Sequence, residues 1–185
     1  GFSTYVEVGG LSGRLCGAFR PGHFRGVATV VAKLFNIASP ARAYFGQKDY
    51  QQTVIIKRLA RDLNMAVEVV VCPTIREADG LAMSSRNRYL REDERNAARV
   101  IYRCLVKASE EVRSGIIEVS SLKKTMSDIL TAESLVSDIQ YCSAYDPETL
   151  EELEQAGEET LLAIALRIGG TRLIDNMLVN RATGR

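Results

Sequence analysis

The 185-residue sequence has little of what metal sites, membrane spans and secreted proteins need. It has one His, and its four cysteines form no CxxC pair, which argues against a structural zinc site and predicts no bound metal. We therefore expect buried free thiols at Cys16, Cys72, Cys104 and Cys142. No apolar run approaches about 18 residues, and the first residues carry neither a basic leader nor an apolar core. The expectation is a cytoplasmic globular protein with no membrane partner.

Common signatures of catalysis and nucleotide binding are also missing. The sequence contains no GxGxxG and no Walker A pattern, and no Ser, His and Asp arrangement that spacing can support. Net charge is only +1, but it is unevenly divided. Residues 1–75 carry nine Lys and Arg against four Asp and Glu, and residues 76–185 carry fifteen against nineteen. The basic first part suits an anionic ligand, but the excess is too small and too scattered to predict a nucleic-acid partner.

The hydrophobic patterns predict an α/β fold in two parts, divided near residue 75. In residues 1–75 we expect strands at 4–8, 41–45 and 67–72, with helices at 27–37 and 48–63. In residues 76–185 we expect helices at 92–112 and at 120–131 with a Ser cap, then strands at 136–142, 161–168 and 173–179. Alternating helices and strands in the first part imply parallel crossovers, and the second part reads as a small α+β lobe.

Three strands are too few for an open parallel sheet covered on both faces. The sequence also begins at Gly1, inside a strand lead-in, without an initiator Met. We therefore expect a fragment, whose first part should show an exposed sheet edge or apolar face.

Residues 73–87 form a candidate phosphate-binding loop that we expect to be mobile. Its end, SSRN, offers two hydroxyls, a guanidinium and a carboxamide, groups that bind phosphate oxygens. Gly80 and Ala82 are small and are expected to let the backbone approach a ligand. The alternative is an ordinary helix lead-in, because Ser and Asn also favour caps and turns.

A second candidate cluster lies where a predicted strand ends and a helix begins. Ligands of open α/β sheets bind at this position. Gly46 permits close approach, and Lys48 adds positive charge at a helix N-terminus. Gln52, one turn later, could reach a second substrate, but Lys48 and Asp49 could also simply start a solvated helix. Together the two loops imply a nucleotide whose phosphates lie between the lobes.

Two further groups are weaker candidates. His23 and Arg20 share a polar turn and could line a site, although a lone His is more often structural. A stripe of arginines at i, i+4 spacing could resemble a phosphate track, but neighbouring acidic residues favour a solvated face. The stripe consists of Arg91, Arg95, Arg99 and Arg103.

Three ordered motifs make the sequence specific: RPGHFRGVATVVAKLFN at 20–36, YFGQKDYQQ at 44–52 and READGLAMSSRN at 76–87. They closely resemble the pantothenate synthetase (pantoate–β-alanine ligase) family, in order and over nearly the whole chain. The resemblance implies membership of the nucleotidyltransferase superfamily, to which class I aminoacyl-tRNA synthetases also belong. Residues 1–75 would be part of a Rossmann-type domain that binds ATP and pantoate, and residues 76–185 a small lid domain.

The resemblance implies amide formation between pantoate and β-alanine, driven by ATP with Mg²⁺, through a pantoyl adenylate. Lys48 and Arg86 would be catalytic, and Gln52 would hold pantoate. The implied ATP-binding residues are Gly46, Gln47, Lys48, Asp49, Ile75, Met83, Ser84, Ser85 and Arg86, the last four matching the KMSKS loop. A homodimer is the implied assembly of the full-length protein.

This sequence departs from the family pattern in several places. Gln47 stands where Glu is common, and Arg91 where a capping Ser or Thr is usual. The family's HIGH-type motif and an earlier pantoate-binding Gln are not in these 185 residues, which we therefore expect to be inactive alone. Two alternatives stay open: another adenylate-forming member of the superfamily, and a non-catalytic nucleotide-binding or dimerisation module.

Overall fold

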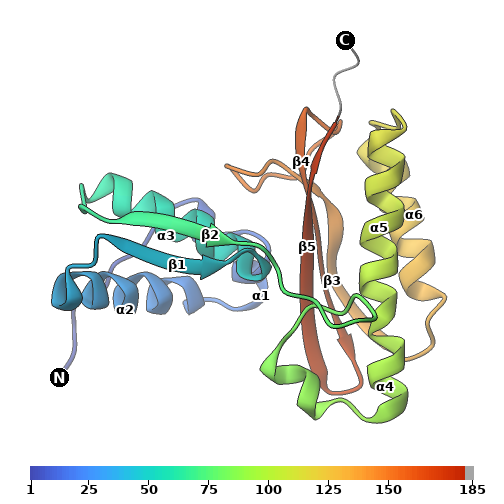
Figure 1. The fold of residues 1–185 in the computed structure, drawn as a ribbon, viewed down its shortest axis with the longest axis horizontal. Coiled ribbons are helices and arrows are strands. Elements are labelled where there is room, and N and C mark those ends of the chain that lie inside the picture. Colours follow the sequence, from blue (N-terminus) through green and yellow to red (C-terminus); the bar gives the residue numbers. More distant parts are fainter. Residues whose placement is uncertain (182–185) are drawn as a thin grey trace. The chain divides into compact units, whose positions relative to one another are not determined.

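The computed structural model describes residues 1–181 and divides the chain into two compact α/β units, Gly1–Pro73 and Thr74–Arg185 (Figure 1). The first unit contains a parallel sheet of two strands, and the second an antiparallel sheet of three strands. No helix among residues 1–181 is both long enough and apolar enough to cross a membrane.

The first unit is a parallel strand pair with two main helices. Its elements are the 3-10 turns η1 (Leu11–Gly13) and η2 (Gln47–Asp49), helices α1 (Cys16–Phe19), α2 (His23–Ala38) and α3 (Tyr50–Asp62), and strands β1 (Arg42–Gly46) and β2 (Glu68–Cys72). The strands pair in parallel, from Arg42 opposite Glu68 to Gly46 opposite Cys72. Helix α3 connects them, so the predicted parallel crossover is confirmed.

The strand predicted at residues 4–8 is wrong. The Val6 backbone N–H donates to Thr29 Oγ1 at 2.9 Å, so this segment is attached to the side of α2. The Thr29 hydroxyl in turn donates to the Arg25 carbonyl at 2.7 Å. A side-chain acceptor on a helix therefore replaces the sheet ladder that the alternating sequence suggested.

Helix α2 carries apolar residues on two faces, one buried and one exposed. Its buried residues are Phe24, Ala28, Thr29, Val31, Ala32 and Phe35. Val30, Leu34 and Ile37 form a separate stripe at helical spacing and are 51%, 55% and 78% exposed. The first unit therefore presents an exposed apolar face on α2.

The second unit is a three-stranded sheet with helices against it. Its elements are η3 (Ser85–Tyr89), α4 (Glu92–Ala97), α5 (Arg99–Arg113), α6 (Val119–Thr131), β3 (Val136–Tyr145), β4 (Glu159–Ile168) and β5 (Thr171–Asn180). The strand order is β3-β4-β5, and both neighbouring pairs are antiparallel. Gly169 and Gly170 form the predicted hairpin turn, with Gly169 at φ +53°.

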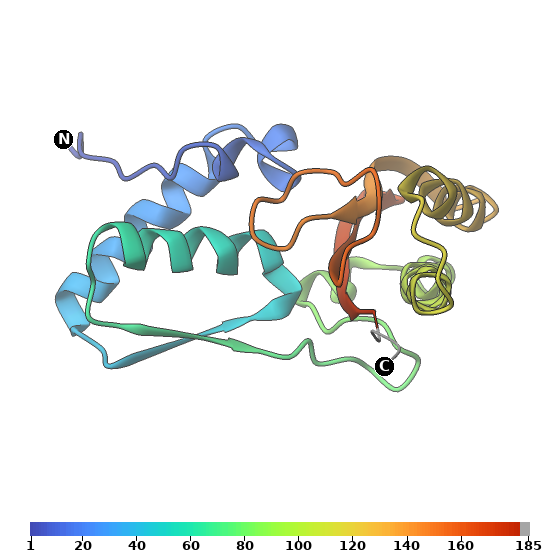
Figure 2. The ribbon, with the colours of Figure 1, turned by 90° about the horizontal axis from the view of Figure 1, so that it is seen from above.

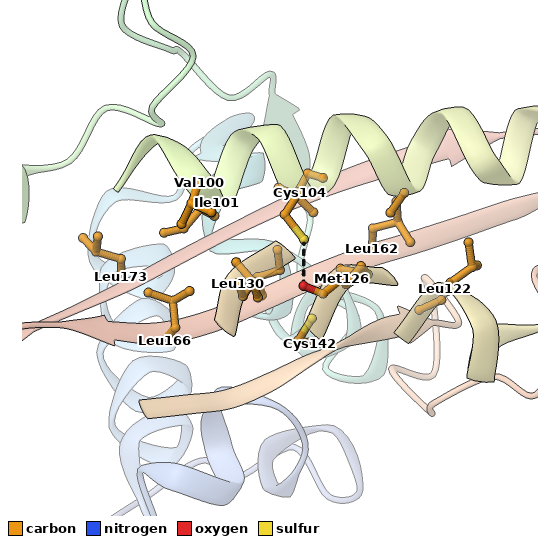
Figure 3. Packing of buried hydrophobic residues seen from close by; sticks show 14 of the residues in the cluster. Val100, Ile101, Cys104, Leu122, Met126, Leu130, Cys142, Leu162, Leu166 and Leu173 are labelled. Carbon is orange, nitrogen blue, oxygen red and sulfur yellow. Dashed lines mark hydrogen bonds between the residues drawn. The ribbon is translucent and has the colours of Figure 1, made fainter. Parts of the chain in front are cut away.

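Helices α5 and α6 pack on the same face of this sheet, where they enclose the main core (Figures 1 and 2). Figure 3 shows Cys104 of α5 donating to the Met126 carbonyl of α6, with Cys142 of β3 nearby. Interaction with the Cys142 thiol, together with burial, raises the pKa of Cys104. All four cysteines are free thiols, but Cys72 is only partly buried.

Two helix boundaries differ from the prediction. The helix expected at 92–112 is divided into α4 and α5 at Ala98. Helix α6 begins at Val119 after Glu118, without a side-chain cap. At the start of α4, Arg91 has no side-chain acceptor, so only the return bond of a capping box forms, from the Arg91 N–H to Glu94 Oε2 at 2.9 Å.

Candidate functional site

The cluster at residues 46–49 lies at the carboxyl end of β1, where η2 leads into α3. A Cβ added to Gly46 would meet no atom within 4 Å, so the space beside this backbone is open. Gln47 and Lys48 are partly exposed and Asp49 is exposed. The position combines an open backbone, a Lys side chain and the N-terminal end of a 13-residue helix, which suits an anionic group.

Gln52 is partly exposed in the first turn of α3, and the preceding Gln51 has a role that the sequence analysis missed. Gln51 is 5% exposed, and its Nε2 donates to the carbonyls of Leu11 and Arg14 at 2.9 and 2.6 Å. It therefore fixes the turn before α1 against α3. The sequence spacing could have predicted that Gln51 is buried, because it lies four positions before the apolar Ile55 and therefore on the same helix face.

Arg20 and His23 are brought together in the first unit. Arg20 Nη1 lies 3.0 Å from His23 Nε2, and the His23 ring packs against the Phe24 ring with centroids 4.9 Å apart. Because Arg can only donate, Nε2 accepts in this bond. His23 is also the first residue of α2, so this contact joins the polar turn to the helix start.

Residues 75–83, in the second unit, form a small hairpin. The Met83 N–H donates to the Ile75 carbonyl and the Glu77 N–H to the Leu81 carbonyl, each at 2.9 Å. Gly80, at φ +91°, closes the turn, and a Cβ there would overlap the Tyr102 ring. Ala82 is 2% exposed. The ligand access expected at Gly80 and Ala82 is therefore wrong, because both pack against the protein.

Helix α4 holds this hairpin through Arg95. Arg95 contacts Glu77 Oε2 at 2.6 Å and Asp79 Oδ2 at 2.7 Å, and Arg99 lies 3.6 Å from Asp79. Hydrogen bonds from Arg95 lower the pKa of both carboxyls, and a bond from Asn87 lowers that of Glu77 further. The reading of the arginine stripe as a solvated face is therefore wrong at Arg95, whose side chain is only 24% exposed.

Residues 83–86 leave the hairpin and are accessible. Met83, Ser85 and Arg86 are exposed, and Ser84 Oγ accepts a bond from the Arg86 N–H at 3.2 Å. The Arg86 guanidinium reaches the Arg172 carbonyl at 3.4 Å. Ile75, opposite Met83 in the hairpin, is 66% exposed. Hydroxyls, a guanidinium and an apolar side chain of residues 83–86 are therefore accessible to a ligand, together with Ile75 on the opposite side of the hairpin.

The predicted site residues thus fall into one group in each unit. Arg20, His23 and residues 46–52 belong to the first unit, whereas Ile75 and residues 83–86 belong to the second. Among residues 1–181, the structure gathers no three His, Cys, Asp or Glu side chains that could hold a metal ion. The ligand roles of these residues stay predictions.

Comparison with known proteins gives a consistent result. The sequence model described as pantoate-beta-alanine ligase matches residues 2–178. Pantothenate synthetase of Thermodesulfovibrio yellowstonii is 58% identical over 179 residues, 97% of this chain and 64% of the relative. The chain thus spans slightly less than two thirds of the length of that relative.

Two solved structures are similar to the chain. Pantothenate synthetase from Thermus thermophilus has a TM-score of 0.91 and 45% identity, with 96% of this chain and 64% of that chain covered. Pantoate-beta-alanine ligase from Francisella tularensis, complexed with beta-gamma ATP and beta-alanine, has a TM-score of 0.71 and 31% identity, with 95% and 58% covered. These matches show that the chain belongs to the pantoate–β-alanine ligase family.

Proposed function

We propose that the full-length protein containing this chain joins pantoate and β-alanine into pantothenate at the expense of ATP. The match to the ligase family over residues 2–178 carries this proposal. In the first step the pantoate carboxylate attacks the α-phosphate of ATP, which gives pantoyl adenylate and releases pyrophosphate. In the second step the amine of β-alanine attacks the acyl carbon, which gives the amide and releases AMP.

Lys48 and Arg86 supply the positive charge that this chemistry needs. Negative charge builds up on the α-phosphate and on the departing pyrophosphate, and fixed cations stabilise it most in the transition state. Residues 46–49 would hold the nucleotide phosphates, supported by the open backbone at Gly46. Ser84 and Ser85 would add hydroxyl donors, while Ile75 and Met83 would provide apolar contacts for the adenine side.

Gln52 would hold pantoate through its carboxamide. A carboxamide has both donor and acceptor atoms, so it can bind a hydroxyl or a carboxylate without adding charge. Gln52 lies in the first turn of α3 and Lys48 in the preceding turn η2, so both follow directly after the carboxyl end of β1, which supports this role. Arg20 and His23 are further candidates for lining the site.

Mg²⁺ would enter this reaction with ATP. The ion commonly binds substrate phosphates and keeps several waters, with one or two protein carboxylates at most. The exposed Asp49 at the start of α3 is compatible with such a supporting contact. The ion would neutralise phosphate charge while bound mainly by the phosphates and water.

We further propose that sequence outside these 185 residues completes the site. The family resemblance assigns the HIGH-type motif and a second pantoate-binding Gln to such a segment. The exposed stripe of Val30, Leu34 and Ile37 supports a covering partner for the first unit, which a further segment or a second subunit would supply. A homodimer in the cytoplasm is the proposed state of the full-length protein.

The test is ATP–pyrophosphate exchange with the full-length protein. Exchange that requires pantoate, followed by pantothenate formation on addition of β-alanine, is the expected result. Exchange with a different carboxylic acid would instead identify another adenylate-forming enzyme. ATP binding without exchange under any of these conditions would identify a nucleotide-binding module.

A further inference from the structure

The side chain of Asn87 connects the two ends of the exposed segment 83–86 by hydrogen bonds. The Asn87 Nδ2 donates to the carbonyl of Ala82 at 3.2 Å and to Glu77 Oε1 at 2.8 Å. Ala82 directly precedes the segment and Asn87 directly follows it. The Asn87 N–H also donates to the Ser84 carbonyl at 3.1 Å. Residues 83–86 are therefore a short loop whose two ends are joined through one carboxamide.

The other end of this contact is firmly fixed. Glu77 belongs to the 75–83 hairpin, and its second oxygen, Oε2, accepts from Arg95 of α4 at 2.6 Å. Because hydrogen bonds from Arg95 and Asn87 lower the pKa of Glu77, its carboxylate stays ionised near neutral pH. A charged acceptor makes a stronger bond than a neutral one, so Arg95, Glu77 and Asn87 form a continuous link from helix to loop.

One atom of the Asn87 carboxamide is in an unfavourable environment. Asn87 Oδ1 is buried and has no hydrogen-bond partner within residues 1–181. An unpaired buried acceptor is unfavourable. The favourable interactions of this carboxamide are therefore the two hydrogen bonds that Nδ2 donates. The adjacent residues 83–86 are those to which we assign ATP.

We propose that Asn87, held by Glu77 and Arg95, is a positioning residue for the ATP-binding segment 83–86. This inference rests on the proposed function of that segment. Asn87 touches no reacting atom in the proposal; it fixes where Arg86 and the two serines meet the phosphates. Small errors in the position of such groups reduce turnover strongly, because their contribution depends on alignment in the transition state.

The test compares variants of the full-length protein by turnover and by amide hydrogen exchange of residues 83–87. Asn87→Ala should lower kcat by about 10- to 100-fold, with KM for ATP changed less than about threefold, and should speed exchange in this segment. Asn87→Asp should be equally damaging, because a second carboxylate would face Glu77. Asn96→Ala, at an exposed position on α4, is the matched control and should leave both readouts unchanged.

A swap of donor and acceptor tests whether the hydrogen bond between residues 77 and 87 is itself responsible for the effect. In the double variant Glu77→Gln with Asn87→Asp, the new amide at residue 77 can donate to the new carboxylate at residue 87. The bond to the Ala82 carbonyl is not restored, so kcat should recover only in part, about three- to tenfold above Asn87→Asp.

Normal kcat per folded Asn87→Ala protein would overturn the inference, and so would unchanged exchange in residues 83–87. The proposed function has its own readout, namely pantothenate formation by the wild type. If the wild type forms no pantothenate, the proposed function fails, and exchange still decides whether Asn87 holds the segment.

Discussion

Arg76 and Asp175 are 99 residues apart in sequence and meet through two hydrogen bonds, of 2.6 and 3.1 Å. Asp175 lies on β5 with a side chain only 2% exposed, and the Arg76 guanidinium also stacks 4.5 Å from the centre of the Tyr102 ring. The same guanidinium donates to the Gly80 carbonyl at 3.0 Å. This pair therefore attaches the 75–83 hairpin to the sheet of the second unit.

Removal of the Arg76 side chain should destabilise the second unit strongly. Arg76→Ala leaves the buried Asp175 carboxylate without its cation, and we expect a loss of about 3–5 kcal/mol in the free energy of unfolding. The double variant with Asp175→Ala should lose less than the sum of the two single variants. Urea denaturation measures this. Arg167→Ala, at an exposed pair with Asp138, should cost at most about 1 kcal/mol, and equal costs at both sites would refute the prediction.

Gly80 should not tolerate a side chain. Gly80→Ala would place a methyl group against Tyr102 in a backbone conformation that L-residues rarely adopt, at a cost of about 1–3 kcal/mol. Gly170→Ala is the matched control, because a Cβ there meets no atom within 4 Å. Thermal unfolding of the two variants decides the matter, and equal melting temperatures would be inconsistent with the hairpin packing described here.

Arg86 and Lys48 should matter for turnover more than for folding. Arg86→Ala or Lys48→Ala in the full-length protein should each lower kcat/KM by about 10²–10³-fold. Arg86→Lys should recover little, because Lys lacks the planar fork. Steady-state pantothenate formation is the measurement, with Lys57→Ala, an exposed position on α3, as control. Near-normal turnover of either alanine variant would remove that residue from the proposed mechanism.

The carboxyls held by Arg95 should make the second unit sensitive to acid. Their pKa values are lowered in the folded state, so their stabilisation is present above the ordinary carboxyl pKa of about 4 and is lost as pH falls through the lowered values. The double variant Glu77→Gln with Asp79→Asn should therefore be less stable than wild type near neutral pH. That gap should narrow below about pH 4.

Urea denaturation at a series of pH values measures this gap. Glu110→Gln, at an exposed position on α5, serves as the control with one less carboxyl. A gap for the Glu77 and Asp79 double variant that stays constant from neutral to acid pH would contradict the assignment.

The 185-residue chain should not catalyse the reaction alone. The proposed site needs groups outside these residues, so the isolated chain should form no AMP from ATP and pantoate above the rate without protein. The full-length protein is the positive control in the same assay. AMP formation by the isolated chain would show that its own residues suffice for adenylation.

Regular elements were predictable from the sequence where a local pattern decides the structure. The β-branched run at 67–72 and the glycine pair at 169–170 led to the correct strand and hairpin. The segment at 4–8 failed because its partner, the Thr29 hydroxyl, lies 23 positions further along the chain. Local alternation carries no information about such a partner.

The candidate site shows the same division. The motifs predicted ligand roles for residues in the ranges 46–52 and 83–86, which stay predictions, but did not predict the groups that hold these segments in place. Gln51, Arg95 and Asp175 act through contacts between distant parts of the sequence, with separations of 16 to 99 residues for the arginine and aspartate bonds. Arg95 was misread because a charged residue that directly follows three acidic residues, at 92–94, usually faces solvent.

The Arg76–Asp175 contact also makes the support of the hairpin depend on a strand far along the sequence. The hairpin at 75–83 comes early in the second unit, whereas its anchor, Asp175, lies on β5, 99 residues after Arg76. Closing a loop of this length costs conformational entropy, which the contacts of the formed sheet offset. The hairpin therefore lacks this support in any state in which β5 is not in place. A chain shortened before β5 would keep every residue of 83–86 and yet lose the acceptor that holds the base of that segment.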